Sequence, residues 1–252
     1  MDNFAVVRLV HADAIFARVA DGLIKSVRLR MGVPDRADAD VEEEFSALRK
    51  ELDTHIAEFS ELFAGLLRQH VGDQHLGDVL TAMESPAAQR YLQAVGLIDH
   101  ELEQSLELIH RNMTRVACAA LGEGPESPVP SEHAAAASGL ARVTGADRVF
   151  FGLVQAVVRQ VLEQGRGGAE SSASPGVAAE RVRAALHGLY PAFDSFYASL
   201  FIRHVGAEQA PLVLGELTSE PMRRYLHARA AMSTALAASV QQLRVRMGQM
   251  EL

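Results

Sequence analysis

The sequence predicts an all-α protein made of two similar helical units. Apolar residues recur at steps of three and four, which is the spacing of an amphipathic helix. Helix-forming alanine, leucine, arginine and glutamate are abundant, whereas aromatic residues make up only 6% of the chain and no window alternates as a half-buried strand does. The second half of the chain also repeats the first, which indicates two copies of one helical plan.

Length and composition narrow the possible classes of protein. With 252 residues, 48% of them hydrophobic, the chain can form one large or two modest domains. A net charge of -8 argues against a general attraction to nucleic acid or acidic membranes. The most apolar segment, 149–162, is too short to span a bilayer and contains Arg159. A single cysteine, Cys118, and an N-terminus without signal-peptide character lead us to expect a cytoplasmic protein.

The repeat appears when the sequence is shifted by 134 positions and aligned with itself without a gap. His-Val-Gly at 70–72 recurs at 204–206, and Arg-Tyr-Leu at 90–92 recurs at 224–226. Helical periodicity inflates matches between apolar residues, but it does not produce these polar ones. We therefore predict an internal duplication.

The predicted units are 1–121 and 135–252, joined by a linker at 122–134 that contains three prolines and two glycines. In the first unit we expect helices over about 4–31, 40–71, 74–83 and 86–120. The last of these begins with Ser85 as its N-cap and Pro86 in its first turn. The second unit should copy this plan. The predicted architecture is two tandem, pseudo-twofold-related four-helix units packed together.

Two histidines occupy equivalent places in the repeat. His70 and His204 each stand at the end of a helix, two residues before a glycine. An imidazolium at this place is stabilised by the helix dipole, so we predict that both histidines cap and pack. A pair of histidines related by a pseudo-twofold axis could also hold a metal or a haem, and this alternative stays open.

Glu107 and His110 have the Glu-x-x-His spacing that places two metal ligands one turn apart on the inner face of a di-iron helical bundle. Such a site needs a second Glu-x-x-His and further glutamates. Gln241 and Arg244 stand at the matching positions of the second unit, so the ligand set is incomplete. We therefore predict neither a metal nor any other cofactor.

The phenylalanines could line a cavity for an apolar ligand, although filling a core is the simpler interpretation. The residues concerned are Phe59, Phe63, Phe150, Phe151, Phe193, Phe196 and Phe201. Tyr91 and Tyr225 begin the last helix of each unit and are further candidates for contact with a ligand or a partner.

Residues 84–92 read Glu-Ser-Pro-Ala-Ala-Gln-Arg-Tyr-Leu, and Leu-Phe-Ala precedes them at 62–64. This segment resembles the bacterial helical domain of unknown function numbered two-zero-five-nine, whose pattern includes Ser-Pro-x-Gly-Gln-Lys. The serine, the proline and the glutamine match, whereas alanine replaces the glycine and arginine replaces the lysine. The copy at 219–226 is more divergent. The resemblance implies a helical fold and no mechanism, because that family has no established activity.

The sequence contains no glycine-rich phosphate loop, nucleophile elbow or paired-cysteine zinc motif. We therefore expect a non-enzymatic helical interaction or adaptor protein with an unidentified protein partner. A duplicated chain presents a pair of similar surfaces, which also allows a homo-oligomer. The alternatives are a carrier of an apolar small ligand, a metal or haem protein that uses the histidines, and an enzyme whose motif the sequence does not display.

Overall fold

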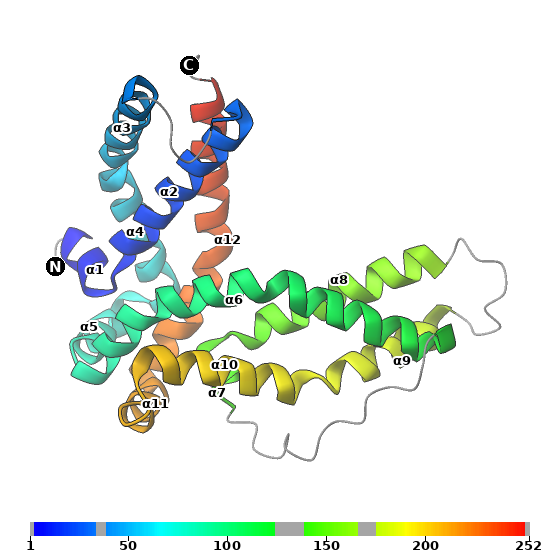
Figure 1. Ribbon diagram of the computed structural model, residues 1–252. Helices are drawn as coiled ribbons and strands as arrows, with labels where there is room; N and C mark the ends of the chain where they lie inside the picture. The colour runs from blue at the N-terminus through cyan, green and yellow to red at the C-terminus, as the bar shows by residue number, and fades with distance from the viewer. Residues whose placement is uncertain (1–2, 34–38, 124–138, 166–174, 250–252) are drawn as a thin grey trace. The chain divides into compact units, whose positions relative to one another are not determined.

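The computed structural model describes residues 3–33, 39–123, 139–165 and 175–249, and its regular elements there are all helical (Figure 1). The first half contains α1 (Asn3–Leu9), α2 (Ala12–Met31), α3 (Ala39–Thr54), α4 (Ile56–Val71), α5 (Asp73–Met83), α6 (Pro86–Cys118) and a π-helical turn, η1 (Ala119–Glu123). The second half contains α7 (Leu140–Thr144), α8 (Asp147–Gly165), α9 (Pro175–His187), α10 (Tyr190–Val205), α11 (Ala210–Leu217) and α12 (Glu220–Gln249). The predicted all-α class is therefore confirmed.

The prediction of four helices in each unit is wrong, because two predicted helices are interrupted. The helix expected over 4–31 breaks at His11, whose φ of 52° is left-handed and cannot continue a right-handed helix. The helix expected over 40–71 breaks at His55. There the Thr54 hydroxyl donates a 2.6 Å hydrogen bond to the Glu51 carbonyl, and the His55 N–H bonds instead to Leu52, three residues back.

Glycine ends α4 and α10 in the same way. Gly72 and Gly206 have φ angles of 84° and 96°, a region that L side chains rarely adopt. Their N–H groups donate 2.9 Å hydrogen bonds to the carbonyls of Arg68 and Ile202. Each helix therefore closes on its glycine, as the sequence predicts.

A serine begins α6 and α12 in the same way. Ser85 Oγ accepts the N–H of Ala88 at 3.2 Å, and Ser219 Oγ accepts the N–H of Met222 at 3.4 Å. Pro86 occupies the first position of α6, where its missing N–H costs nothing. The predicted start of the last helix in the first unit is confirmed.

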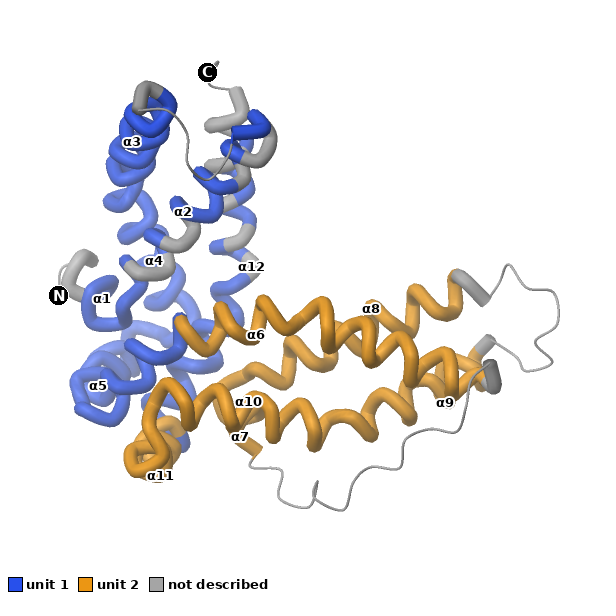
Figure 2. Tube along the Cα trace, in the orientation of Figure 1, with its two compact units in different colours: residues 1–96, 218–252 blue, residues 97–217 orange. Residues whose placement is uncertain are grey.

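The chain forms two compact units that differ from the two sequence halves (Figure 2). Unit 1 consists of residues 1–96 and 218–252, and unit 2 consists of residues 97–217. Unit 1 therefore includes α12 from the second half of the sequence, and unit 2 includes the part of α6 that follows Gly96. The predicted linker 122–134 lies, from residue 124 onward, outside the described residues.

In unit 1, α12 packs against α4 and α5, and α1 packs against α4. Phe63 and Leu67 on α4, Met83 on α5 and Met232 on α12 are almost completely buried. These side chains supply the hydrophobic core that holds the four helices together.

A glutamine ties three helix ends of unit 1 together. The Gln89 amide nitrogen donates to the carbonyl of Leu9 at 2.9 Å and to that of Met83 at 2.8 Å. Its oxygen then faces His11 Nε2 at 3.1 Å, so His11 is the donor in that contact. Gln89 thereby fixes the ends of α1 and α5 to the start of α6.

In unit 2, α10 packs against α7, α8 and α11, and α9 packs against α8 and η1. Asp194 lies on α10 with no exposed surface, and its carboxylate accepts the N–H groups of Gly139 at 3.0 Å and Ala141 at 2.9 Å. A negative charge at this place satisfies the free N–H groups at the start of α7 and complements the dipole of that helix. Among the described helices, none is long and apolar enough to cross a membrane.

Candidate functional site

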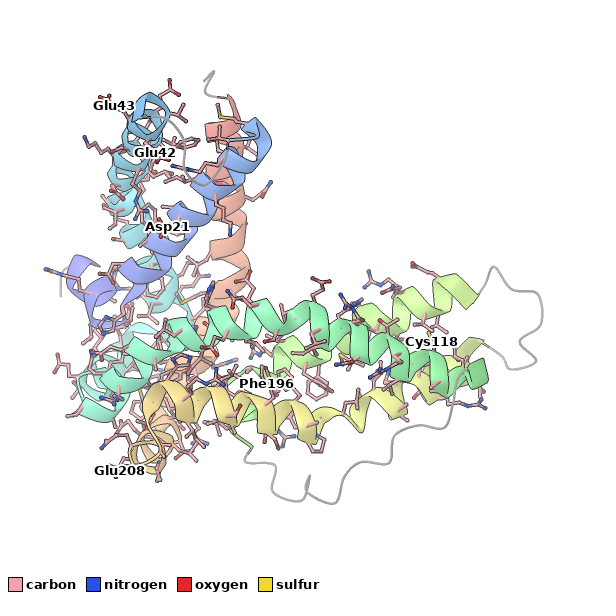
Figure 3. All side chains as sticks on the ribbon, viewed as in Figure 1. Asp21, Glu42, Glu43, Cys118, Phe196 and Glu208 are labelled. Carbon is pink, nitrogen blue, oxygen red and sulfur yellow. The ribbon has the colours of Figure 1, made fainter. Side chains whose placement is uncertain are left out.

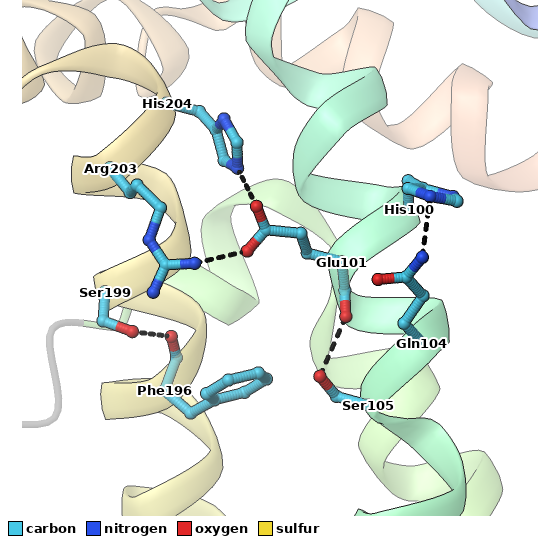
Figure 4. A network of polar contacts seen from close by, with 8 residues as sticks. All are labelled: His100, Glu101, Gln104, Ser105, Phe196, Ser199, Arg203 and His204. Atoms are coloured by element: carbon cyan, nitrogen blue, oxygen red, sulfur yellow. Dashed lines mark hydrogen bonds and ion pairs between the residues drawn. The ribbon is translucent and has the colours of Figure 1, made fainter.

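A carboxylate joins α6 to α10 within unit 2 (Figure 4). Glu101 accepts a 2.9 Å contact from His204 Nε2 on one oxygen and a 2.6 Å contact from Arg203 on the other. The His204 side chain is 15% exposed and that of Arg203 is 61% exposed, so the histidine is shielded while the arginine faces solvent. This network fixes the end of α10 against the middle of α6.

Apolar side chains flank Glu101 along α6. Leu97 and Leu108 are 56% and 59% exposed. Steps of four and seven residues return to one side of an α-helix, so Leu97, Glu101 and Leu108 form a single stripe.

The neighbouring part of α10 adds an aromatic ring and an arginine. Phe196 is half-buried, and its ring points from α10 toward α6 (Figures 3 and 4). Arg203 follows Phe196 by seven residues and therefore lies on the same side of α10. We use the name α6–α10 face for the side chains of Leu97, Glu101, Leu108, Phe196 and Arg203.

The α6–α10 face combines exposed aliphatic groups, an aromatic ring and an arginine. Aromatic side chains and arginine are enriched at protein interfaces, where they anchor partners more often than lysine or glutamate do. Because exposed ion pairs contribute little to stability, the pairing of Arg203 with Glu101 serves mainly to orient the two side chains.

An aromatic cluster fills the space between α8 and α10. Phe151 stacks on Tyr190 with ring centroids 5.6 Å apart, and Phe150 lies 5.3 Å from Tyr190 and 5.2 Å from Phe193. His187 at the end of α9 contacts Phe151 edge-on at 5.5 Å. These rings contact one another, so they form packing between helices.

Tyr190 has the clearest electrostatic perturbation in this cluster. Burial raises the pKa of its phenol, and the charges of Asp194 and Asp147 raise the pKa further because they oppose a phenolate. Arg142 partly offsets this effect by lowering the pKa. Tyr190 therefore holds its proton more tightly in the folded protein than in the unfolded chain.

The aromatic candidates from the sequence are divided between the units. Unit 1 contains Phe59, Phe63, Tyr91 and Tyr225, and unit 2 contains Phe193 and Phe196. The Phe59 ring lies 5.2 Å from that of Phe16 and 6.1 Å from that of Phe63. Tyr91 and Tyr225 are almost completely buried in unit 1. The structure thus brings Phe59 and Phe63 together, and it places Phe193 in the aromatic cluster and Phe196 on the α6–α10 face.

The metal-ligand candidates are likewise dispersed. His70 is exposed at the end of α4 in unit 1, whereas His204 belongs to the network in unit 2. Glu107 is exposed and pairs with Arg111 at 2.7 Å, and His110 is half-buried. Within the part of the chain that the structure describes, no three His, Cys, Asp or Glu side chains gather closely enough to hold a metal.

Glu101 and Asp194 are not among the residues predicted from the sequence. Asp194 could have been found, because it interrupts the otherwise apolar inward stripe of Phe193, Tyr197 and Phe201, and a carboxylate there needs buried donors. Glu101 gives no such local indication, since its partners lie far away in the sequence.

No protein-family model matches the chain, and comparisons with curated proteins and with solved structures also find no match.

Proposed function

We propose that this protein is a non-enzymatic helical interaction protein formed by internal duplication, and that the α6–α10 face binds a protein partner. The duplication is supported by the helix bounds. α4 and α10 each contain 16 residues and begin 134 positions apart, which is the shift that aligns the two sequence halves.

Backbone features that are not simply helical support the duplication further. His11 and Gly145 stand at equivalent positions, and both have positive φ, 52° and 81°. Gly72 and Gly206 are a second pair of this kind. Unrelated helical halves would have no reason to place left-handed residues at matching positions, because such residues are uncommon outside glycine.

The observation that carries the proposed function is that the α6–α10 face occurs only once. The positions that match Leu97, Glu101 and Leu108 are Ala231, Ala235 and Gln242. Those that match Phe196 and Arg203 are Leu62 and Gln69. The two exposed leucines and Arg203 of unit 2 thus have alanine or glutamine at the matching positions of unit 1. A surface that combines exposed leucine with arginine and an aromatic ring in only one copy of the repeat is suited to a binding role.

Affinity capture with surface variants tests this function. Purified protein carrying Leu97→Glu or Leu108→Glu should lose a protein that the unmodified chain retains, because either change places a charge within the contact. Leu212→Glu is the matched control, since Leu212 is 64% exposed in unit 2 and lies on α11, which contributes no residue to the face.

A retained protein that both face variants lose and the control keeps would support the proposal. Equal retention by all four proteins would show that the face does not bind it. Native mass spectrometry of the purified chain distinguishes the carrier alternative, which requires additional organic mass on the protein. A second copy of the chain as the retained partner would identify a homo-oligomer.

A further inference from the structure

The last helix of the second half lies in the unit built from the first half. Along α12 the buried side chains are Met222, Tyr225, Leu226, Ala228 and Met232. Their spacing forms one stripe of a helix, and α12 packs against α4 and α5. Part of the core of unit 1 is therefore formed by a helix that begins more than 120 residues after residue 96.

The part of α6 that follows Gly96 has a comparable place in unit 2. Beyond Gly96, α6 buries Leu102, Met113 and Val116 within unit 2. Glu101 on the same segment binds His204, and the η1 turn that follows α6 packs against α9. Unit 2 is thus closed by a segment of the first half.

We propose that each repeat carries a helix-accepting surface whose partner is the last helix of a second copy of the repeat, and that this chain contains two such copies fused together. This inference rests on the duplication in the proposed function. Reciprocal use of one surface by two copies is the pattern of an isologous pair. The covalent connection at 122–134 then holds together copies that already bind each other.

Two matched substitutions in the full chain test the exchange. Met113 lies on α6 in unit 2 and Met232 lies on α12 in unit 1, and each is at most 1% exposed. Replacing Met232 by Asp should speed backbone hydrogen exchange in α4 and α5 by on the order of a hundredfold, because a buried charge destabilises the unit that contains it. Met113→Asp should have the corresponding effect on α8, α9 and α10.

Each substitution should therefore weaken helices that belong to the opposite half of the sequence. Met113→Ala and Met232→Ala provide the same test with a smaller perturbation if the aspartate variants do not fold. Faster exchange confined to the half that carries the substitution, or spread equally over both units, would overturn the proposal.

Cleavage of the intact chain provides the second test. A variant with a specific protease site in place of residues 126–131 is cut to completion and examined by native mass spectrometry. The two fragments should remain one particle with the mass of both, whereas separated fragments would overturn the proposal. Neither test requires an external partner. Their failure is therefore distinguishable from failure of the α6–α10 face to bind one.

Discussion

α4 in unit 1 and α10 in unit 2 end on the same backbone geometry, yet their terminal histidines have different surroundings. His70 is exposed, whereas His204 is shielded and bound to Glu101. The two glycine caps have similar backbone angles, with φ of 84° and 96° and ψ of 139° and 137°. The end of each helix is therefore determined by the residues next to it, whereas the partner of the equivalent side chain differs between the two copies.

The interiors of the two helices show the same contrast. Ser60 and Asp194 hold equivalent positions, and both are fully buried. The Ser60 hydroxyl donates to the carbonyl of Ile56 one turn back in its own helix. Asp194 instead accepts N–H groups from the start of another helix, α7. Unit 2 thus depends on a tertiary polar contact at a place where unit 1 uses a local one.

Substituting Ser60 and Asp194 one at a time should give the largest difference in the free energy of unfolding between equivalent positions of the two units. Asp194→Ala removes the acceptor of two N–H groups and should lower the free energy of unfolding by about 3 kcal/mol. Ser60→Ala loses only a bond within its own helix and should cost less than about 1 kcal/mol. Urea unfolding followed by circular dichroism measures both. Similar costs for the two variants would refute the contrast.

High pH should weaken unit 2 selectively. The raised pKa of Tyr190 means that the folded protein retains a proton that the unfolded chain releases. The resulting stabilisation is complete below the unfolded pKa of about 10 and is lost as pH rises through the folded pKa. Unit 1 has Ile56 at the equivalent position, which does not titrate.

Urea unfolding between pH 8.5 and 11 measures this effect, and absorbance at 295 nm follows ionisation of tyrosine. The Tyr190→Phe variant should lose the part of the pH dependence that comes from this residue. If the variant keeps the full dependence of the unmodified protein, Tyr190 is not its source.

The terminal histidines should differ by a smaller amount. His204→Ala removes a shielded contact to Glu101 and should cost about 1 kcal/mol. His70→Ala changes an exposed side chain and should alter the free energy of unfolding by less than about 0.5 kcal/mol. Thermal unfolding of both variants provides the measurement, and a larger cost at His70 would reverse the comparison.

Copying the network into unit 1 should have the smallest effect. Ala235 stands on α12 at the position equivalent to Glu101, and α12 packs against the helix that carries His70. Ala235→Glu should stabilise the protein by about 0.3 kcal/mol through a new contact with His70. In a double-mutant cycle this gain should vanish when His70 is replaced by Ala. A gain that persists in that background would have another source.

Much of the helical pattern is predictable because its causes are local. Gly72 and Gly206 end helices through their own conformational freedom, and Ser85 begins one through its own hydroxyl. The break at His11 was not predictable in this way, because histidine rarely adopts positive φ and Gln89, which holds it, lies 78 residues away.

The candidate site was less predictable than the fold. The pairing of Glu101 with His204 spans 103 positions, and α6 must pack in unit 2 before the two side chains can meet. His70 and His204 have the same sequence context, so no local rule distinguishes the exposed residue from the paired one. The aromatic candidates failed to indicate a site for a related reason, since packing alone decides whether rings line a space or fill it.

The place of α12 in unit 1 has a consequence for synthesis on the ribosome. Helices α1 to α5 emerge first, but the part of the α4 and α5 surface that packs against α12 is covered only when α12 has been made. At translation rates of about 5–20 residues per second, the intervening chain takes roughly seven to thirty seconds to appear. Unit 2, whose residues are contiguous, is complete before unit 1 is. During this time the nascent N-terminal helices expose an apolar surface to solvent. We therefore expect chaperones that bind such surfaces to determine how much of the protein reaches its native state.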